Sequence, residues 1–161
     1  MVWDSSYLNL LLETEAGDGS FLITLFRMPV RRIVAALLPR SGRLLLCRRP
    51  AGKLQAGKWE FPGGKLEPGE REPVALAREL AEELGIAARP ERMRLLLRRR
   101  QWYAETGWLD LAFYQVNGWR GRPGRRHYSV LRWVPLHRLS RYDLLAADRL
   151  ALGKLSAALK R

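Results

Sequence analysis

Three glutamates, Glu79, Glu82 and Glu83, stand within five consecutive residues of this sequence. If the segment is helical, spacings of three and four residues bring their carboxylates within about 6 Å of one another. Like charges at that distance repel by about 3 kcal/mol per pair at an effective dielectric constant near 20. A cation is therefore expected among them. Hard carboxylate oxygens favour Mg²⁺, with Mn²⁺ as an alternative, and no His or Cys stands nearby to suggest zinc.

The segment that carries these glutamates is predicted to be a helix over residues 73–84. Pro73 suits the first turn of a helix, and Gly85 suits the position just beyond the last turn. At about 100° per residue, the apolar residues expected to share one buried face are Ala77, Leu80, Ala81 and Leu84. The glutamates would then lie on nearly the opposite face. The common explanation of such a pattern is a solvated acidic face, and only a wider motif argues against it.

A glycine-containing loop precedes the predicted helix. The strand expected over residues 58–61 is followed by Pro62, Gly63 and Gly64. Proline ends the strand, and the two glycines permit backbone angles and close approaches that side chains would block. This loop is therefore suited to wrap a phosphate.

The loop and the helix together contain a string with nine specified positions: Gly64-x5-Glu70-x7-Arg78-Glu79-Leu80-x-Glu82-Glu83-x-Gly85-Ile86. At ordinary residue frequencies, its chance occurrence in a chain of this length is on the order of one in ten million. The string resembles the Nudix box, the signature of hydrolases that act on a nucleoside diphosphate linked to another group. The flanking residues 58–70 are similar to those of MutT-like nucleoside triphosphate pyrophosphohydrolases, which include enzymes acting on oxidised nucleotides and on CTP.

The resemblance implies an α/β fold, the Nudix α/β/α sandwich with a mixed β-sheet, and a role for each residue of the box. Glu79, Glu82 and Glu83 would hold metal ions together with the Gly64 backbone, and Glu79 would also accept a proton from the attacking water. Arg78 would orient Glu79, Gly63 would approach the metal or phosphate, and Glu70 would brace the loop. Hydrolysis of a phosphoanhydride needs charge neutralisation and an in-line water, which clustered metal ions provide. A triphosphate would yield a monophosphate and pyrophosphate.

Two residues outside the box are expected to contact the nucleotide. Arg49, 15 residues before Gly64, matches the position where MutT-like enzymes place an arginine beside the nucleotide. Asp148 matches the Asn or Asp that this subfamily presents to the base, although an Asp near a helix start is also a common cap. An ionised Asp148 would accept two hydrogen bonds from guanine or 8-oxoguanine, which predicts a preference for guanine-type triphosphates at neutral pH. Cytosine would pair fully only with a protonated carboxyl or an amide, so cytosine nucleotides would gain if the site raised the pKa of Asp148.

The resemblance is incomplete at a further metal ligand. Related enzymes carry another carboxylate beyond the box, and the two matching places hold Asn117 and His127. Asp110 or Glu60 could compensate, so the number of metal ions stays open.

Other activities are compatible with the same motif. Tyr103 lies close to where dinucleoside polyphosphate hydrolases carry a tyrosine, so a Nudix hydrolase of dinucleoside polyphosphates or nucleotide sugars is the alternative. The formal charge of +13, with 24 arginines among the 29 basic residues, also raises nucleic-acid binding or hydrolysis of RNA 5′ ends. The intact carboxylate set argues against a protein that merely binds, so a nucleotide is the expected partner. The sequence leaves the oligomeric state open.

The chain is long enough for one domain of 161 residues. Residues 29–161 are expected to form the Nudix domain, and residues 1–28 an N-terminal extension without an assignable motif. Apolar runs fall short of the roughly 20 residues needed to cross a membrane, and the N-terminus lacks the pattern of a signal peptide, which predicts a cytoplasmic protein. Cys47, the only cysteine, follows three leucines and is expected to be a buried structural thiol.

The remaining elements are predicted from apolar patterns. Two short runs at residues 32–38 and 43–49 flank a tight turn and are expected to pair as a hairpin. The other expected elements are strands over residues 93–103, 108–116 and 130–134 and a helix over residues 144–159. Strands interrupted by helices, without strict alternation, predict a mixed sheet with helices on its faces.

Overall fold

The apolar run after Arg32 forms the buried centre of a mixed sheet. The computed structural model describes residues 7–15, 21–104 and 107–158. Its central sheet has the order β7-β3-β10-β9, with β3 parallel to β10 and the other pairs antiparallel. The strands are β3 (Arg31–Leu37), β7 (Gly63–Lys65), β9 (Met93–Tyr103) and β10 (Gly107–Val116). A strand buried on both faces needs apolar residues at consecutive positions, as β3 has.

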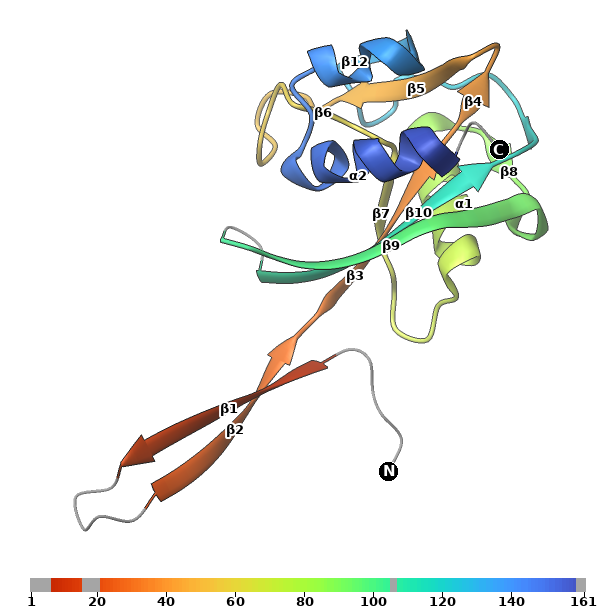
Figure 1. Cartoon of the computed structure of the whole chain (residues 1–161). Coiled ribbons are helices and arrows are strands. Elements are labelled where there is room, and N and C mark those ends of the chain that lie inside the picture. Colours follow the sequence, from red (N-terminus) through yellow and green to blue (C-terminus); the bar gives the residue numbers. More distant parts are fainter. Residues whose placement is uncertain (1–6, 16–20, 105–106, 159–161) are drawn as a thin grey trace.

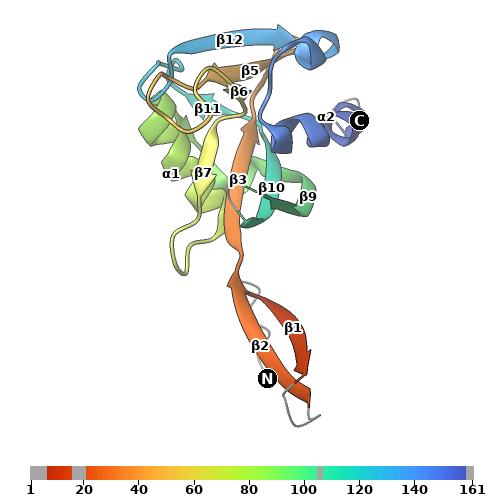
Figure 2. The same cartoon turned by 90° about the vertical axis from the view of Figure 1, so that its left-hand side faces the viewer.

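Two helices cover the two faces of this sheet (Figure 2): α1 (Glu72–Leu84) and α2 (Ala146–Ala158). Because side chains alternate along a strand, Val34 and Ala36 share a buried cluster with the leucines of α1. Ala35 and Leu37 share the other cluster with apolar residues of α2. The predicted α/β/α sandwich with a mixed sheet is confirmed.

The expected hairpin between residues 32–38 and 43–49 is wrong in its pairing. Strand β3 belongs to the central sheet, and only the two-residue strand β4 (Pro39–Arg40) pairs with β5 (Arg43–Arg48). β5 instead pairs along its length with β12 (Val130–Pro135) and also with β6 (Trp59–Glu60). Residues 34–37 of β3 and 44–47 of β5 are all buried, because the two strands lie in two different sheets.

Helix α1 begins one residue before the predicted start and ends at the predicted residue. Gly85 follows it with φ 72° and donates its N–H to the carbonyl of Ala81, which confirms the glycine C-cap. The predicted buried face is confirmed at Leu80 and Leu84 but wrong at Ala81, which is exposed, and Ala75 and Leu76 are buried in addition.

Glu79 and Glu83 therefore lie within the arc of α1 that faces the protein. At 100° per residue both positions fall between Ala75 and Leu84, and both side chains are only partly exposed. The carboxylate of Glu79 accepts a hydrogen bond from its neighbour Arg78, and that of Glu83 accepts hydrogen bonds from Gly63 and Tyr128 in other segments.

The first residue of α1, Glu72, anchors the start of the helix to the sheet. Its carboxylate accepts hydrogen bonds from Arg98 Nη1 and Nη2 (2.8 and 2.7 Å), the Tyr114 hydroxyl (2.6 Å) and Arg32 Nη2 (2.9 Å). Burial alone raises the pKa of Glu72, but these hydrogen bonds outweigh it and hold the pKa at about 2. Glu72 is therefore ionised and fully paired.

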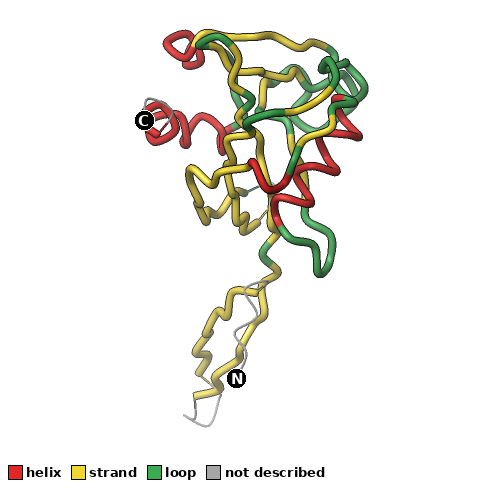
Figure 3. Tube along the Cα trace, turned by 90° about the vertical axis from the view of Figure 1, so that its right-hand side faces the viewer, coloured by secondary structure: helices red, strands yellow, loops and turns green. Residues whose placement is uncertain are grey.

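The N-terminal segment, to which the sequence assigned no element, forms an antiparallel hairpin in its described part. Strands β1 (Tyr7–Glu15) and β2 (Phe21–Pro29) pair over nine residues each. β2 leads through Val30 into β3, and the hairpin projects away from the rest of the molecule (Figures 1 and 3).

The remaining predicted elements match closely. β9 has the predicted bounds, β10 and β12 each differ by one residue, and α2 covers most of residues 144–159, of which residue 159 lies outside the described part. Cys47 is buried and free, as expected. Smaller elements complete the fold: β8 (Ala87–Ala88), β11 (Trp119–Arg120) and the 3-10 helices Pro90–Arg92 and Leu136–Arg141. Within the described residues, no helix is long and apolar enough to span a bilayer.

Candidate active site

The glycine pair of the loop packs directly against the helix that bears the glutamates. A Cβ atom at Gly64 would collide with the carboxylate of Glu79. A Cβ at Gly63, whose φ is +150°, would collide with the backbone of Val34. Gly63 therefore requires glycine for both backbone conformation and close approach, whereas a side chain at position 64 would displace the carboxylate of Glu79.

Arg78 ties Glu79 to the loop. Its Nη1 donates to Glu79 Oε1 (3.1 Å), while its Nε and Nη2 donate to the two oxygens of Glu70 (3.1 and 3.0 Å). Glu70 also accepts the backbone N–H of Glu67 at 3.1 Å, which closes the loop. The hydrogen bonds from Arg78 lower the pKa of Glu70. The structure thus places Arg78 and Glu70 as one bridge between loop and helix.

The three glutamates differ in environment. Burial raises the pKa of Glu79, partly offset by the hydrogen bond from Arg78. Burial also raises the pKa of Glu83 to about 7, opposed by hydrogen bonds from the Tyr128 hydroxyl (2.5 Å) and the Gly63 N–H (3.2 Å). The side chain of Glu82 is 51% exposed and its contact with Arg78 is 3.5 Å long. Glu82 is therefore the least constrained member of the row.

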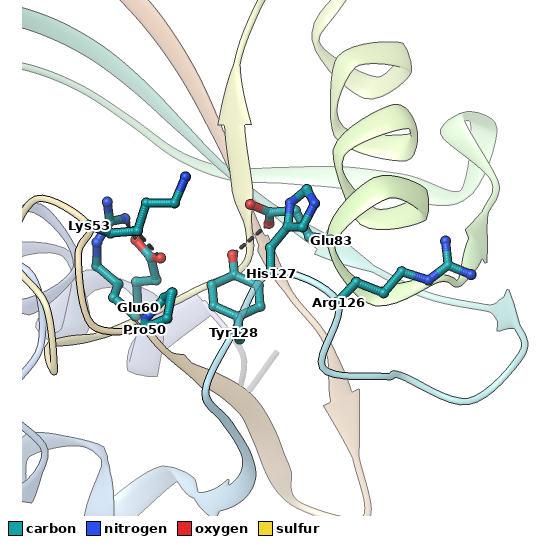
Figure 4. Close-up of a pocket in the computed structure, with 8 residues that line it drawn as sticks. Pro50, Lys53, Glu60, Glu83, Arg126, His127 and Tyr128 are labelled. Atoms are coloured by element: carbon teal, nitrogen blue, oxygen red, sulfur yellow. Dashed lines mark hydrogen bonds and ion pairs between the residues drawn. The ribbon is translucent and has the colours of Figure 1, made fainter.

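A pocket of about 420 Å³ adjoins the end of this glutamate row (Figure 4). Its lining combines carboxylates with basic groups: Arg49, Pro50, Lys53, Glu60, Glu83, Arg126, His127 and Tyr128. Glu83 is the residue shared by the pocket and the sequence motif. The volume lies within the range of small-molecule sites, and basic side chains next to carboxylates suit a phosphorylated ligand bound with a metal cation.

Arg49 lines this pocket but is already paired. Its Nη1 contacts both carboxylate oxygens of Glu60 (3.0 and 2.8 Å), and its Nε donates to the carbonyl of Leu54 at 2.8 Å. Burial raises the pKa of Glu60, and Arg49 opposes that shift. The guanidinium is thus held at the pocket wall in a fixed orientation.

Asp148 lies behind the pocket and does not line it. It belongs to the first turn of α2, is 5% exposed, and accepts the backbone N–H of Phe61 at 3.3 Å. Burial raises its pKa well above the ordinary value. Among the described residues, Tyr103 Oη and Arg99 Nε are buried polar atoms without a hydrogen-bond partner. Tyr103 and Ala147 pack against the same buried cluster. Burial raises the pKa of Tyr103, the charge of Arg99 opposes that shift, and Asp148 adds to it.

His127 and Asn117, which stand where related enzymes carry a further carboxylate, lie in different parts of the structure. His127 lines the pocket, whereas Asn117 is exposed beyond β10 and accepts a hydrogen bond from Gln115. Asp110 is ion-paired with Arg98 and Arg100, while Glu60 faces the pocket. Of the two compensating carboxylates considered, Glu60 is the one near the glutamate row.

The site fits a divalent metal in its chemistry. Glu79, Glu82 and Glu83 supply hard oxygens, and the backbone of Gly64 meets Glu79 because no side chain intervenes. In the described part of the chain, no three acidic, His or Cys side chains converge as a preformed metal site.

Several pocket residues had no signal in the sequence. Tyr128, Lys53 and Arg126 belong to loops without a recognisable spacing, and they reach Glu83 or the pocket only through the tertiary fold. Arg126 also donates its Nη1 to the carbonyl of Ala81 at 3.0 Å, as a second hydrogen bond beside that from the Gly85 N–H in the last turn of α1.

The fold is an α/β/α sandwich, and its loop and helix carry a glycine pair, a glutamate bridged by an arginine and a basic pocket. These features together define a hydrolase of the Nudix class. The chain belongs to the Nudix family, because the NUDIX domain model matches residues 28–157. Enzymes of this family generally use a divalent metal.

Named relatives agree with this assignment. The chain is 36% identical over 127 residues to the putative 8-oxo-dGTP diphosphatase 2 of Mycobacterium tuberculosis, covering 79% of this chain and 89% of that protein. It is 56% identical over 61 residues to the CTP pyrophosphohydrolase of Escherichia coli, a match that spans 38% of this chain and only 45% of the relative. The crystal structure of a MutT NUDIX hydrolase from Burkholderia pseudomallei superposes with a TM-score of 0.71 at 31% identity, covering 80% of this chain and 99% of that one.

Proposed function

We propose that this chain hydrolyses nucleoside triphosphates to a nucleoside monophosphate and pyrophosphate, with Mg²⁺ as its metal and Mn²⁺ as a substitute. The observation that carries the proposal is the pocket in which Glu83 and Glu60 stand beside Arg49, Lys53, Arg126 and His127. A triphosphate bound with a metal ion presents both charges that this lining complements. The names of the relatives, a CTP pyrophosphohydrolase and an 8-oxo-dGTP diphosphatase, support the same reaction.

The glutamate row is proposed as the catalytic centre. Glu79, Glu82 and Glu83 would hold the metal with the backbone of Gly64. When bound, the metal would neutralise phosphate charge and acidify the attacking water. Glu79, oriented by Arg78, would accept the proton of that water. The new bond forms between the water oxygen and phosphorus, the phosphoanhydride bond breaks, and pyrophosphate leaves.

The basic residues of the pocket are proposed to bind the polyphosphate. Arg49 is held by Glu60 and Leu54, so its position is set before the substrate enters, which lowers the entropic cost of binding. Lys53 and His127 have exposed side chains and can adjust to the phosphate groups.

The environment of Asp148 supports a proposal about the base. Because burial raises its pKa, the neutral carboxyl is favoured, and a neutral carboxyl both donates and accepts a hydrogen bond. It complements a base edge with a donor beside an acceptor, as in cytosine and the N7–H and O6 edge of 8-oxoguanine. The Watson–Crick edge of guanine fits a neutral carboxyl through N1–H and O6 and an ionised carboxylate through its two adjacent donors, so the protonation state of Asp148 alone does not exclude guanine. We propose cytosine or oxidised-guanine triphosphates as substrates on the added support of the relatives named for them.

Two buried polar atoms without a hydrogen-bond partner support the same location for the base. Tyr103 Oη and Arg99 Nε are buried without a partner in the described part of the chain, and such groups normally pair with a ligand or water. A base that reached these atoms would supply those partners.

The test is product analysis over a nucleotide panel with Mg²⁺ and with Mn²⁺. The panel contains CTP, dCTP, 8-oxo-dGTP, dGTP and ATP, together with a dinucleoside polyphosphate, a nucleotide sugar and a 5′-triphosphorylated RNA. We expect pyrophosphate release from single triphosphates, with dCTP or 8-oxo-dGTP preferred over dGTP. Efficient cleavage of the dinucleoside polyphosphate or nucleotide sugar, without pyrophosphate from the triphosphates, would replace this function by the alternative Nudix activity.

A further inference from the structure

Glu83 differs from the other two glutamates of the row because two donors hold the same oxygen of its carboxylate. The Tyr128 hydroxyl donates to Oε2 at 2.5 Å, and the Gly63 N–H donates to the same atom at 3.2 Å. Figure 4 shows the phenol of Tyr128 directed at Glu83 across the inner end of the pocket. Oε1 is therefore the oxygen that these donors leave for other contacts.

Tyr128 is fixed in place from two sides. On one side, Ser129 donates its N–H and its hydroxyl to the carbonyl of Arg48 in β5 (2.9 and 3.1 Å). On the other, Arg126 N–H donates to the carbonyl of Glu83 (3.2 Å) and Gly124 N–H to that of Leu84 (2.8 Å). Residues 124–129 thus join the second sheet to the last turn of α1. Tyr128 itself is only 7% exposed, so its hydroxyl has little freedom to leave Glu83.

The chemical type of the donor matters as much as its position. Arg78 holds Glu79 with a positive charge, but a second cation at Glu83 would cancel the negative charge that attracts a metal. A phenol supplies a short hydrogen bond without adding charge. The pairing of a neutral donor with Glu83 therefore orders the carboxylate and preserves its attraction for a cation.

We infer that Tyr128 is a positioning residue of the catalytic centre, which occupies Oε2 of Glu83 so that Oε1 is presented to the divalent metal. The inference rests on the proposed function, because it assigns a task to one of the proposed metal ligands. Tyr128 contacts neither water nor phosphate in this role and acts only through Glu83.

The experiment compares Tyr128→Phe with Tyr114→Phe. Tyr114 provides a matched control because its hydroxyl also donates to a glutamate of α1, Glu72, at 2.6 Å, but at the opposite end of the helix. Each substitution removes one buried tyrosine hydroxyl that donates a hydrogen bond to one glutamate. Mn²⁺ binding is measured on each protein without nucleotide, by electron paramagnetic resonance of the free ion, and kcat and KM are then measured with dCTP.

We expect Tyr128→Phe to weaken Mn²⁺ binding about tenfold and to lower kcat at least tenfold, with KM for the nucleotide changed by less than about threefold. Tyr114→Phe should lower the melting temperature while Mn²⁺ binding and kcat stay within about twofold of the wild type. Wild-type Mn²⁺ binding in Tyr128→Phe would overturn the inference, and so would equal losses in both variants. If the wild type binds Mn²⁺ but cleaves no nucleotide of the panel, the proposed function fails while the binding comparison still decides the role of Tyr128.

Discussion

The ion cluster at the start of α1 allows a quantitative prediction of stability against pH. Glu72 is almost fully buried and accepts hydrogen bonds from two arginines and a tyrosine, which hold its pKa at about 2 against an ordinary value of 4.5. A depressed pKa in the folded state means that folding favours the ionised form. The difference between these two pKa values corresponds to about 3 kcal/mol of stability at neutral pH. This contribution is fully present above pH 4.5 and is lost as the pH falls toward 2.

The perturbation is Glu72→Gln, which keeps the size of the side chain and removes its charge. We expect the free energy of unfolding at pH 7 to fall by about 3 kcal/mol, equivalent to about 6 to 12 °C in melting temperature for a chain of this size. At pH 3 the wild type has already lost part of the stabilisation that ionised Glu72 provides. The difference in the free energy of unfolding between the two proteins should therefore shrink to about 1 kcal/mol.

Urea unfolding followed by tryptophan fluorescence, at several pH values between 3 and 7, measures both differences. Glu91→Gln, at an exposed position in the 3-10 helix Pro90–Arg92, is the control and should change stability by less than about 0.5 kcal/mol throughout. A loss in Glu72→Gln that is the same at pH 3 and pH 7 would refute the linkage argument. A loss below 1 kcal/mol at pH 7 would show that the cluster does not stabilise the helix start.

Four further predictions follow from the site. Glu79→Gln should lower kcat at least about a hundredfold with little change in melting temperature, measured by pyrophosphate release and thermal unfolding, and near-normal turnover would contradict its catalytic role. Asp148→Asn should keep the preference for dCTP over dGTP, because an amide also donates and accepts hydrogen bonds. Asp148→Ala should cost about 1 to 3 kcal/mol in kcat/KM for the preferred nucleotide. Equal losses on every base would indicate a purely structural role. Millimolar Mg²⁺ should raise the melting temperature of the wild type, and the rise should disappear in Glu83→Gln; an equal rise in both would place the metal elsewhere. The matched family region begins at residue 28. Removal of residues 1–28 should therefore leave kcat/KM for the triphosphate within about twofold of the wild type. A larger loss would make the N-terminal hairpin part of the catalytic unit.

The sequence by itself determined the features that depend on neighbours along the chain. The proline at position 73 and the glycine at position 85 mark the ends of α1 because one fits the first helical turn and the other adopts a positive φ. The extent of β9 and the α/β/α class follow from apolar patterns. The motif around Glu79, Glu82 and Glu83 identified the family because its residue types and spacing are improbable by chance.

Only the tertiary structure decided how these elements meet. β3 and β5 were expected to pair, yet each needed burial on both faces, and two separate sheets provide it. Glu79 and Glu83 were expected on an exposed face but lie in the protein-facing arc of α1, where Glu83 is met by donors distant in sequence. Tyr128 reaches Glu83 from 45 residues away, and Tyr114 reaches Glu72 from 42. The physical reason is that helix and strand preferences act over a few residues, whereas a buried charge is tolerated only where the whole fold brings donors to it.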